Sequence, residues 1–200
     1  MNELRLFDNE YNCVIAGVDE AGRGPLAGPV VAAAVIIEDY FDELDGINDS
    51  KKLTEKKREK LYDIIREKCK VGVGIASENE IDKINILNAT FLAMRRALEQ
   101  VGGYDIVLVD GNHKIREYSG KQQEIIKGDG RSMSIAAASI IAKVYRDNIM
   151  KELALKYPDY RFEKHKGYGT KLHRELLLAH GACEIHRKSF LKKILGEYSE

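Results

Sequence analysis

Short apolar runs of strand length recur along this chain, and the later ones alternate with amphipathic segments of helix length. A strand buried on both faces is apolar throughout, whereas a helix repeats its apolar positions every three or four residues. The runs predict strands at 13–19, 28–37, 71–77, 104–111 and 123–129, and the helical spacing predicts helices at 54–69, 79–84, 86–101, 133–157 and 171–181. This order predicts a mixed sheet with helices packed on its faces, in an α/β or α+β arrangement.

Several helix boundaries are marked by single residues. Ser50 or Thr54 can cap the first long helix, because a side-chain oxygen there accepts a hydrogen bond from a backbone N–H of the first turn. Pro158 cannot continue the long helix before it, and Gly181 is a typical residue just after a helix end.

Composition excludes several classes of protein. With 200 residues, 44% hydrophobic and 32% charged, the chain fits one globular domain with a small C-terminal appendage. It lacks the roughly 20 consecutive apolar residues of a membrane helix and the basic start of a signal peptide. The odd number of widely spaced cysteines and the absence of a C-x-x-C pair argue against a disulfide framework and a structural zinc site, and favour a cytoplasmic location.

The charges are unevenly distributed although their sum is zero. Residues 1–110 carry 14 Lys+Arg and 21 Asp+Glu, and residues 111–200 carry 18 Lys+Arg and 11 Asp+Glu. An acidic half joined to a basic half can place metal-binding carboxylates beside a phosphate-binding surface. Chance asymmetry among solvated faces is the alternative interpretation.

Carboxylates stand at the ends of three predicted strands. They are Asp19 with Glu20, Asp110 and Asp129. If these strands are neighbours, the acids meet, and the repulsion among them is relieved by a divalent cation such as Mg²⁺ or Mn²⁺, which prefers hard oxygen ligands. Consecutive strand residues point to opposite faces, so Asp19 and Glu20 can share a site only where the strand bends or stops. The alternative is that each acid is a cap, a turn residue or a surface charge.

The segment A-G-R-G-P-L-A-G-P (21–29) is glycine-rich but does not fit a dinucleotide-binding loop. Its glycines are spaced G-x-G-x-x-x-G, and prolines and a Val-rich strand follow where a helix would have to begin. Gly22 and Gly24 instead permit close approach of the backbone to a ligand. A plain tight turn is the alternative.

Three further groups of side chains have two interpretations each. Ser139, Lys143 and Arg146 lie near one another at helical spacing, which fits a phosphate contact or a solvated face. His165 and His173 flank a glycine-rich turn, and two histidines eight residues apart are only a weak signal of a metal site. Tyr168 lies between two glycines, so we expect it to be exposed, either stacking on a base or sugar or packing on its neighbours.

Five motifs in order resemble one known family. They are V-D-E-A-G-R-G-P-L-A-G-P (18–29), D-S-K-K-L (49–53), L-V-D-G-N (108–112), K-G-D-G with S-I-A-A-A-S-I-I-A-K-V-x-R-D (127–130 and 134–147), and H-K-G-Y-G-T-K-x-H (165–173). Together they resemble bacterial ribonuclease HII, the type 2 ribonuclease H, over about residues 13–190. H-R-K-S-F (186–190) is similar to that family's C-terminal segment.

The resemblance implies a ribonuclease H-like fold, with a five-stranded mixed sheet flanked by helices and a small helical C-terminal region at about 158–200 of a single domain, 1–200. It implies an endonuclease that hydrolyses the RNA strand of RNA–DNA hybrids. It also implies incision 5′ of ribonucleotides embedded in duplex DNA by two-metal-ion catalysis, leaving 3′-hydroxyl and 5′-phosphate ends. The related type 3 enzymes carry an extra N-terminal domain, so type 2 is favoured by the few residues before the first strand.

The resemblance also assigns residues to roles. The metal-binding, catalytic acids are Asp19, Glu20, Asp110 and Asp129, with Mg²⁺ or Mn²⁺ as cofactor. The substrate-binding residues are Gly22, Arg23 and Gly24 at the ribose 2′-hydroxyl, Tyr168 at the junction between ribose and deoxyribose, and Lys51 in a phosphate-contact loop. Hybrid and ribonucleotide-containing duplexes are the implied partners. We predict a monomer with no obligate protein partner and no membrane.

Two rival functions remain on the same fold. A catalytically silent nucleic-acid-binding protein is disfavoured by four intact acids, because their charge would face phosphates without a catalytic purpose. A DNA-only nuclease or resolvase is disfavoured by the Gly-Arg-Gly motif together with Tyr168, which only ribose selectivity requires.

Overall fold

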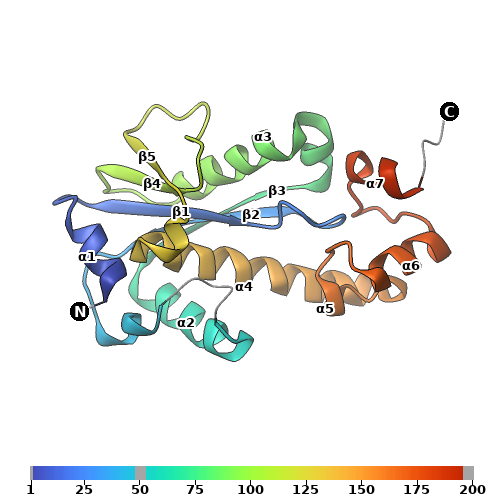
Figure 1. Ribbon diagram of the computed structural model, residues 1–200, viewed down its shortest axis with the longest axis horizontal. Helices are drawn as coiled ribbons and strands as arrows, with labels where there is room; N and C mark the ends of the chain where they lie inside the picture. Colours follow the sequence, from blue (N-terminus) through green and yellow to red (C-terminus); the bar gives the residue numbers. More distant parts are fainter. Residues whose placement is uncertain (1, 48–52, 196–200) are drawn as a thin grey trace.

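The computed structural model describes residues 2–47 and 53–195 and has one mixed sheet between two layers of helices (Figure 1). The sheet order is β3-β2-β1-β4-β5. The β1–β2 and β2–β3 pairs are antiparallel, whereas β1–β4 and β4–β5 are parallel. The strands are β1 (Ile15–Ala21), β2 (Val30–Ile36), β3 (Lys70–Ala76), β4 (Ile106–Asp110) and β5 (Gln122–Ile125). The predicted five-stranded mixed sheet is confirmed.

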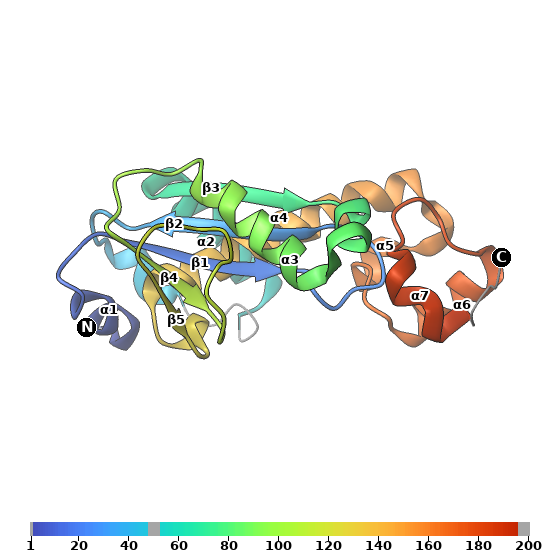
Figure 2. The ribbon, with the colours of Figure 1, turned by 90° about the horizontal axis from the view of Figure 1, so that it is seen from above.

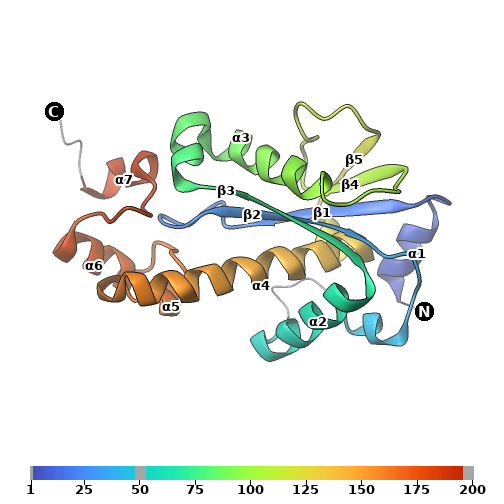
Figure 3. The same ribbon diagram turned by 180° about the vertical axis from the view of Figure 1, so that it is seen from behind.

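The two faces of the sheet are covered by different helices, as Figures 1 and 3 show. Helix α3 covers one face, and α4 covers the other with α2 packed outside it. The helices are α1 (Glu3–Asn9), α2 (Glu55–Lys68), α3 (Glu78–Leu98), α4 (Met133–Lys156), α5 (Phe162–His165), α6 (Lys171–His180) and α7 (Lys188–Leu195), with 3₁₀ turns η1 (Asp42–Gly46), η3 (Gly128–Gly130) and η4 (Pro158–Tyr160). None of the helices in the described segments is long and apolar enough to cross a membrane.

Small residues let the helices lie close to the sheet. Along β2, Ala32 and Ala34 face the α3 core, and Ala33 faces the α4 core, as a period of two requires. A Cβ atom at Gly17 of β1 would lie 2.2 Å from the backbone carbon of Ser134 in α4. The tight contact between β1 and α4 fixes where the end of β1 stands relative to the side chains of α4.

Most helix boundaries follow the predicted signals. Thr54 caps α2 by accepting a hydrogen bond from the Lys57 N–H. Helix α4 ends at Lys156, two residues before Pro158, and Gly181 follows α6. The apolar pattern did not predict α1, α5 and α7 individually, because each is short and none carries a long apolar periodicity. Helices α5 and α7 nevertheless lie in the helical C-terminal region, about 158–200, that the resemblance implied.

Helix α3 contains the break that the sequence predicted between residues 84 and 86. Asn85 has φ 66° and ψ 163°, far from helical values, and its Oδ1 atom accepts the N–H of Asn88 at 3.1 Å. The second part ends at Leu98 and not at residue 101.

The predicted fifth strand, 123–129, is wrong at its C-terminal end. Strand β5 stops at Ile125, and Asp129 lies in the 3₁₀ turn η3. Lys127 has a left-handed backbone with φ 55°, which ends the extended conformation. Asp129 therefore reaches the region of the other acids from a turn before α4 and not from a strand end.

The segments after α4 gather at one end of the molecule, beside the loop that follows β1 (Figure 2). Residues Ala27 and His186 form an isolated antiparallel bridge between that loop and the segment before α7. A buried cluster around Phe162 and Met150 joins these segments to the end of α4. The C-terminal segments thus pack directly against the loop that carries Gly22 to Gly24.

Candidate active site

Asp19 and Glu20 point to opposite faces of the sheet. In the β1–β2 ladder Asp19 stands opposite Ala33, which faces α4, and Glu20 stands opposite Ala32, which faces α3. Asp19 is buried and receives a hydrogen bond from the side chain of Ser139 on α4. Strand alternation therefore still separates these two carboxylates at the end of β1.

Asp110 is a neighbour of both Asp19 and Glu20. It is the last residue of β4, the parallel neighbour of β1. Its carboxylate acts electrostatically on Asp19, and it lines a small cleft together with Glu20 and Thr90. The structure thus brings Asp19, Glu20 and Asp110 to one edge of the sheet, where the C-terminal ends of β1 and β4 lie.

Asp129 reaches this edge through its backbone. Asp110 Oδ1 accepts the N–H of Gly128 at 2.7 Å and the N–H of Asp129 at 3.4 Å. A Cβ atom at Gly128 would lie 3.3 Å from Asp110 Oδ1 and 2.6 Å from Ile135, so a bulkier residue would disturb this contact. The turn η3 therefore holds Asp129 next to Asp110.

The electrostatics of this cluster are unfavourable without a cation. Burial raises the pKa of Asp19 well above its ordinary value of 3.8, and the neighbouring carboxylates of Glu20 and Asp110 raise it further. Hydrogen bonds from Ser139 and from the Glu20 backbone act in the opposite direction. Within residues 2–47 and 53–195, no three Asp, Glu, His or Cys side chains are arranged to hold a metal ion. The acids are neighbours, but their side chains do not form a ready-made coordination cage.

The Gly-Arg-Gly loop lies directly after these acids. Gly22 has φ +96°, a conformation that favours glycine, and a Cβ atom there would lie 2.1 Å from Arg146 Nε. The Arg23 side chain is half exposed, and its Nη1 atom lies 3.3 Å from Glu20 Oε1. The loop therefore begins beside the acids and presents a cation to solvent.

Tyr168 stands beside this loop, in the turn between α5 and α6. The residue is 41% exposed, as predicted, and a Cβ atom at Gly24 would lie 4.0 Å from Tyr168 Cε1. The backbone carbonyl of Tyr168 accepts a hydrogen bond from His173 Nδ1 at 3.0 Å. The structure thus brings together Gly24 and Tyr168, which are far apart in the sequence. Lys51 lies outside the described residues.

Both sequence interpretations of Arg146 are wrong. Arg146 is neither solvated nor free for phosphate, because it is 1% exposed and its guanidinium donates to the carbonyls of Pro29, Lys166 and Ala27. Lys143 is ion-paired with Asp147 at 2.7 Å. Helical spacing places these side chains near one another, but it does not reveal that the loop after β1 covers Arg146.

The histidines form a buried hydrogen-bonded group. The N–H of Cys183 donates to His186 Nδ1, so His186 Nε2–H donates to His173 Nε2 at 3.0 Å, and His173 Nδ1–H donates to the Tyr168 carbonyl. His165 is held separately, by the Gly167 N–H and the Tyr160 carbonyl. In this arrangement the ring nitrogens are used in hydrogen bonds that support the Tyr168 turn.

Sequence reasoning missed Arg187 and His186 as residues that organise this region. The motif H-R-K-S-F marked the segment, but adjacent polar residues near a C-terminus predict an exposed position. Both are buried, and Arg187 is bonded to four carbonyls of the loop after β1.

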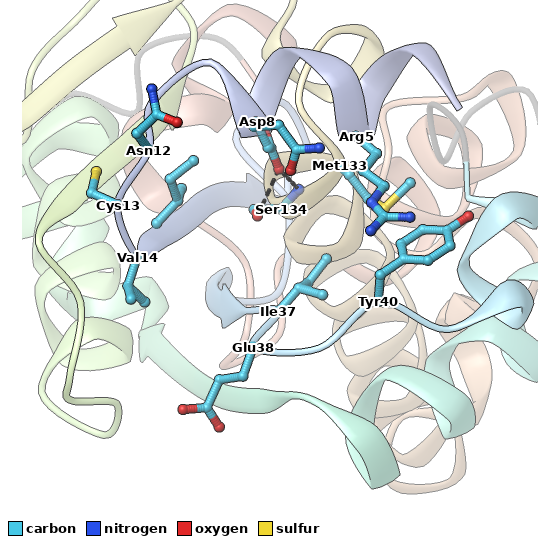
Figure 4. A pocket seen from close by; sticks show the side chains of 12 residues that line it. Arg5, Asp8, Asn12, Cys13, Val14, Ile37, Glu38, Tyr40, Met133 and Ser134 are labelled. Carbon is cyan, nitrogen blue, oxygen red and sulfur yellow. Dashed lines mark hydrogen bonds between the residues drawn. The ribbon is translucent and has the colours of Figure 1, made fainter. Parts of the chain in front are cut away.

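A separate pocket of about 540 Å³ lies at the α1 end of the sheet, lined by α1, the start of β1, the segment just after β2 and the start of α4. Figure 4 shows Asp8 in this pocket pointing at Ser134. Asp8 Oδ2 accepts the N–H of Ser134 at 2.9 Å and its hydroxyl at 2.8 Å, so Asp8 supports the first turn of α4. None of the four predicted acids lines this pocket.

Comparison with known proteins gives a consistent result. The family model described as Ribonuclease HII matches residues 16–193. The chain is similar to Ribonuclease HII of Fusobacterium nucleatum, with 67% identity covering 100% of this chain and 95% of that protein. It is also similar to Ribonuclease HII of Caldicellulosiruptor bescii, with 58% identity covering 97% of this chain and 94% of that protein.

Solved structures agree. The ribonuclease HII in the PCNA:RNase HII complex from Archaeoglobus fulgidus is 30% identical, with a TM-score of 0.72, covering 88% of this chain and 94% of that chain. Bst RNase HIII, solved in complex with Mn²⁺, shares the fold with a TM-score of 0.67 at 19% identity, covering 84% of this chain and 63% of that chain. The chain therefore belongs to the ribonuclease HII family and is a ribonuclease H, a hydrolase of the nuclease class.

Proposed function

We propose that this ribonuclease H incises duplex DNA on the 5′ side of embedded ribonucleotides, in addition to hydrolysing the RNA strand of RNA–DNA hybrids, and leaves 3′-hydroxyl and 5′-phosphate ends. The observation that supports this most is the meeting of two features at one edge of the sheet. The carboxylates of Asp19 and Asp110 interact there, and Gly24 lies beside the exposed Tyr168. One feature suits phosphodiester hydrolysis, and the other suits recognition of a sugar.

The acids suit divalent cations by their chemistry. Carboxylate oxygens are hard ligands of the kind that Mg²⁺ and Mn²⁺ prefer, and a buried carboxylate with a raised pKa beside two others is stabilised by a cation. We infer that Asp19, Glu20, Asp110 and Asp129 hold the ions. When bound, two such ions activate a water and stabilise the leaving oxygen of an in-line displacement.

The protein's own groups would select the ribose. A 2′-hydroxyl is both donor and acceptor, and reading it requires polar groups very close to the sugar. Gly22 and Gly24 carry no side chain that prevents this approach, and Arg23, which lies next to Glu20, can hold the adjacent phosphate. The exposed ring of Tyr168 can stack on the following sugar, where a 2′-hydroxyl would crowd it.

This selection distinguishes the proposal from a nuclease that acts on DNA alone. The Gly24 position has room for a methyl group, since a Cβ atom there meets nothing closer than Tyr168 at 4.0 Å. We therefore expect Gly24→Ala to fold normally and to lose activity or ribose selectivity. Tyr168→Ala should lose much of the rate and Tyr168→Phe less, because the phenylalanine ring still stacks. If Gly24→Ala and Tyr168→Ala both cut a single-ribonucleotide duplex at the wild-type rate and position, the ribose-recognition model is wrong.

The remaining parts of the proposal concern the setting of the enzyme. Its partners would be hybrid duplexes and duplex DNA containing ribonucleotides, which it would meet in the cytoplasm as a monomer. Lys51 would contact a phosphate of the duplex.

The experiment for the metal site compares wild type with Asp110→Asn and Asp129→Asn in Mg²⁺, in Mn²⁺ and in excess chelator. Asp63→Asn, which alters an exposed acid of α2, is the matched control. We expect chelation and Asp110→Asn to abolish cleavage, Asp129→Asn to keep weak activity with Mn²⁺ only, and Asp63→Asn to cleave normally. Robust cleavage in chelator would contradict the metal mechanism, and wild-type rates of Asp129→Asn in Mg²⁺ would remove Asp129 from the site.

A further inference from the structure

The segment around Arg187 pairs with the loop after β1, although about 160 residues separate them in the sequence. The Arg187 N–H donates to the Leu26 carbonyl at 2.9 Å, and the Gly28 N–H donates to the Ile185 carbonyl at 2.9 Å. Ala27 and His186 are bridge partners between these bonds. Because residues in extended backbone alternate in direction, His186 and Arg187 point to opposite sides. Arg187 is thereby directed into the inside of the loop.

The guanidinium group of Arg187 binds the loop from within. It is 0% exposed. Its Nε atom donates to the carbonyl of Gly28 at 2.8 Å, and Nη1 donates to those of Pro25 at 2.8 Å and Arg23 at 3.0 Å. Its Nη2 atom donates to the carbonyl of Gly22 at 2.6 Å. The planar fork of an arginine suits such fixed acceptors, whereas lysine has a single nitrogen.

The positive charge of this group has no ion-pair partner in the part of the chain that the structure describes. Burial and, to a smaller extent, the neighbouring Arg146 lower the pKa of Arg187 to about 9, although Glu78 opposes this. A buried charge without a carboxylate partner lowers the stability of the fold. If Arg187 served only to fill space, an apolar residue would do so with a smaller loss of folding free energy. The loop carbonyls therefore stabilise the charge, and the charge in turn orients the carbonyls.

The orientation of these carbonyls also sets the direction of the loop's N–H groups. In a planar trans peptide the C=O and the following N–H point in opposite directions. Because Arg187 holds the carbonyls of Gly22 and Arg23, the N–H groups of Arg23 and Gly24 point away from the guanidinium. Neither N–H donates a hydrogen bond to a group within residues 2–47 and 53–195.

We propose that Arg187 is a positioning residue for ribose recognition: it holds the Gly22 and Arg23 carbonyls inward so that the N–H groups of Arg23 and Gly24 face the nucleic acid. This inference rests on the proposed function, because it assumes that this loop reads the sugar. Arg187 itself does not touch the substrate. Its effect should therefore appear in discrimination between ribose and deoxyribose, and less in the general affinity for duplex.

The test is equilibrium binding with Ca²⁺ in place of a catalytic ion, so that no cleavage occurs. Two duplexes are compared, one all-DNA and one identical except for a single ribonucleotide. We expect wild type to bind the ribonucleotide duplex more tightly. Arg187→Lys keeps the charge but not the planar fork, so we expect it to reduce that preference at least about tenfold. Its Kd for the all-DNA duplex should change less than about twofold.

The control for lost stability is Tyr160→Phe. The Tyr160 hydroxyl donates to the Gly181 carbonyl at 2.8 Å within the same C-terminal segments, and it has no bond to the loop after β1. This variant should be destabilised but keep the wild-type preference. If Arg187→Lys keeps the full preference for the ribonucleotide duplex, the positioning role is overturned. It is also overturned if Tyr160→Phe loses as much of that preference as Arg187→Lys does. If wild type itself shows no preference, the proposed ribose recognition fails instead.

A measurement on wild type covers the case in which Arg187→Lys does not fold. The guanidinium Nε–H signal of Arg187 should be visible by ¹⁵N NMR and slow to exchange, because the group is buried and bonded. We expect this signal to shift on binding the ribonucleotide duplex and to shift less on binding the all-DNA duplex. Identical shifts with both duplexes would contradict the inference.

Discussion

Asp19 is a buried carboxylate next to two others, which makes it costly to the metal-free protein. Because burial and the carboxylates of Glu20 and Asp110 raise its pKa, the folded state binds a proton more tightly than the unfolded state. The contribution of Asp19 to stability is therefore present below pH 3.8 and is lost as the pH rises through its folded pKa. In the metal-free protein at neutral pH, this group opposes folding.

We predict that Asp19→Asn raises the melting temperature of the metal-free protein at pH 7 and reduces cleavage by at least about a hundredfold, the upper end of losses caused by residues that only support a metal ligand. Differential scanning fluorimetry in chelator and a cleavage assay measure the two effects. A melting temperature at or below that of wild type, with the fold intact, would show that repulsion between Asp19 and its neighbouring carboxylates does not destabilise the protein.

His173 and His186 predict the opposite pH dependence. Burial and, to a smaller extent, a neighbouring histidine lower the pKa of each side chain to about 4. The unfolded state therefore binds more protons between pH 6.5 and about 4, so stability falls as the pH decreases through this window. The maximum slope is about 2.7 kcal/mol per pH unit if both groups contribute.

The measurement is chemical denaturation at several pH values. Replacing both histidines, as His173→Gln with His186→Gln, should lower stability at pH 7 and flatten the acid slope. His180→Gln, which changes an exposed histidine of α6, should keep the slope. An unchanged slope in the double variant would show that other groups cause the acid sensitivity.

At this scale the sequence singled out candidate residues for chemistry, whose roles stay predictions, and missed two buried arginines that bind the loop after β1. Asp19, Glu20 and Asp110 follow apolar runs, and Tyr168 lies between glycines, so each gives a local signal. Arg146 and Arg187 give no such signal, because their burial depends on a loop and a C-terminal segment that meet only in the fold. Charged residues are expected at the surface, and single-residue patterns cannot reveal this exception.

At the scale of elements, the contact between β1 and α4 positions the candidate site. Asp19 and Ser139 face each other only because Gly17 lets the two backbones approach. We predict that Gly17→Ala destabilises the protein by about 3 kcal/mol or more, since the added methyl group would meet backbone atoms of Ser134 and Ile135 that cannot easily move.

Urea denaturation of Gly17→Ala and of Gly102→Ala measures this effect. A Cβ atom at Gly102 would have nothing within 4 Å, so the second variant should change stability by less than about 1 kcal/mol. Equal stability of the two variants would mean that α4 can shift away from β1 without cost.

The elements themselves show which sequence signals sufficed. The apolar periodicity and Pro158 predicted α4 closely, and the break at Asn85 followed from the change of pattern in α3. The predicted fifth strand wrongly extended to Asp129. Lys127 ends the strand by adopting a left-handed backbone, and lysine has no preference for that conformation, so the residue type did not indicate the turn. The apolar pattern missed helix α7 because the helix is short, and because its first turn is stabilised by a distant residue, Asp82, which accepts the N–H groups of Lys188 and Ser189.

At the scale of the whole molecule, the basic second half of the chain predicts salt-sensitive binding. Phosphate contacts by Lys and Arg release counterions, so affinity for duplex should fall linearly with salt on logarithmic axes. We predict that Lys51→Ala weakens binding to all-DNA and ribonucleotide duplexes alike and reduces the salt slope by about 1. Fluorescence anisotropy over a range of salt concentrations measures this slope. An effect of Lys51→Ala confined to the position of cleavage would rule out a phosphate contact.

In our proposal, one edge of the sheet joins phosphodiester hydrolysis to the recognition of a single ribose. This proposal is tested by mapping the cut in a labelled DNA duplex that contains one ribonucleotide. The enzyme with Mg²⁺ or Mn²⁺ should cut once, on the 5′ side of the ribonucleotide, and leave a 3′-hydroxyl and a 5′-phosphate, whereas the matching all-DNA duplex should stay intact. Cleavage of the all-DNA duplex at a similar rate, or no cleavage of the ribonucleotide duplex by an enzyme that degrades long hybrids, would contradict the account.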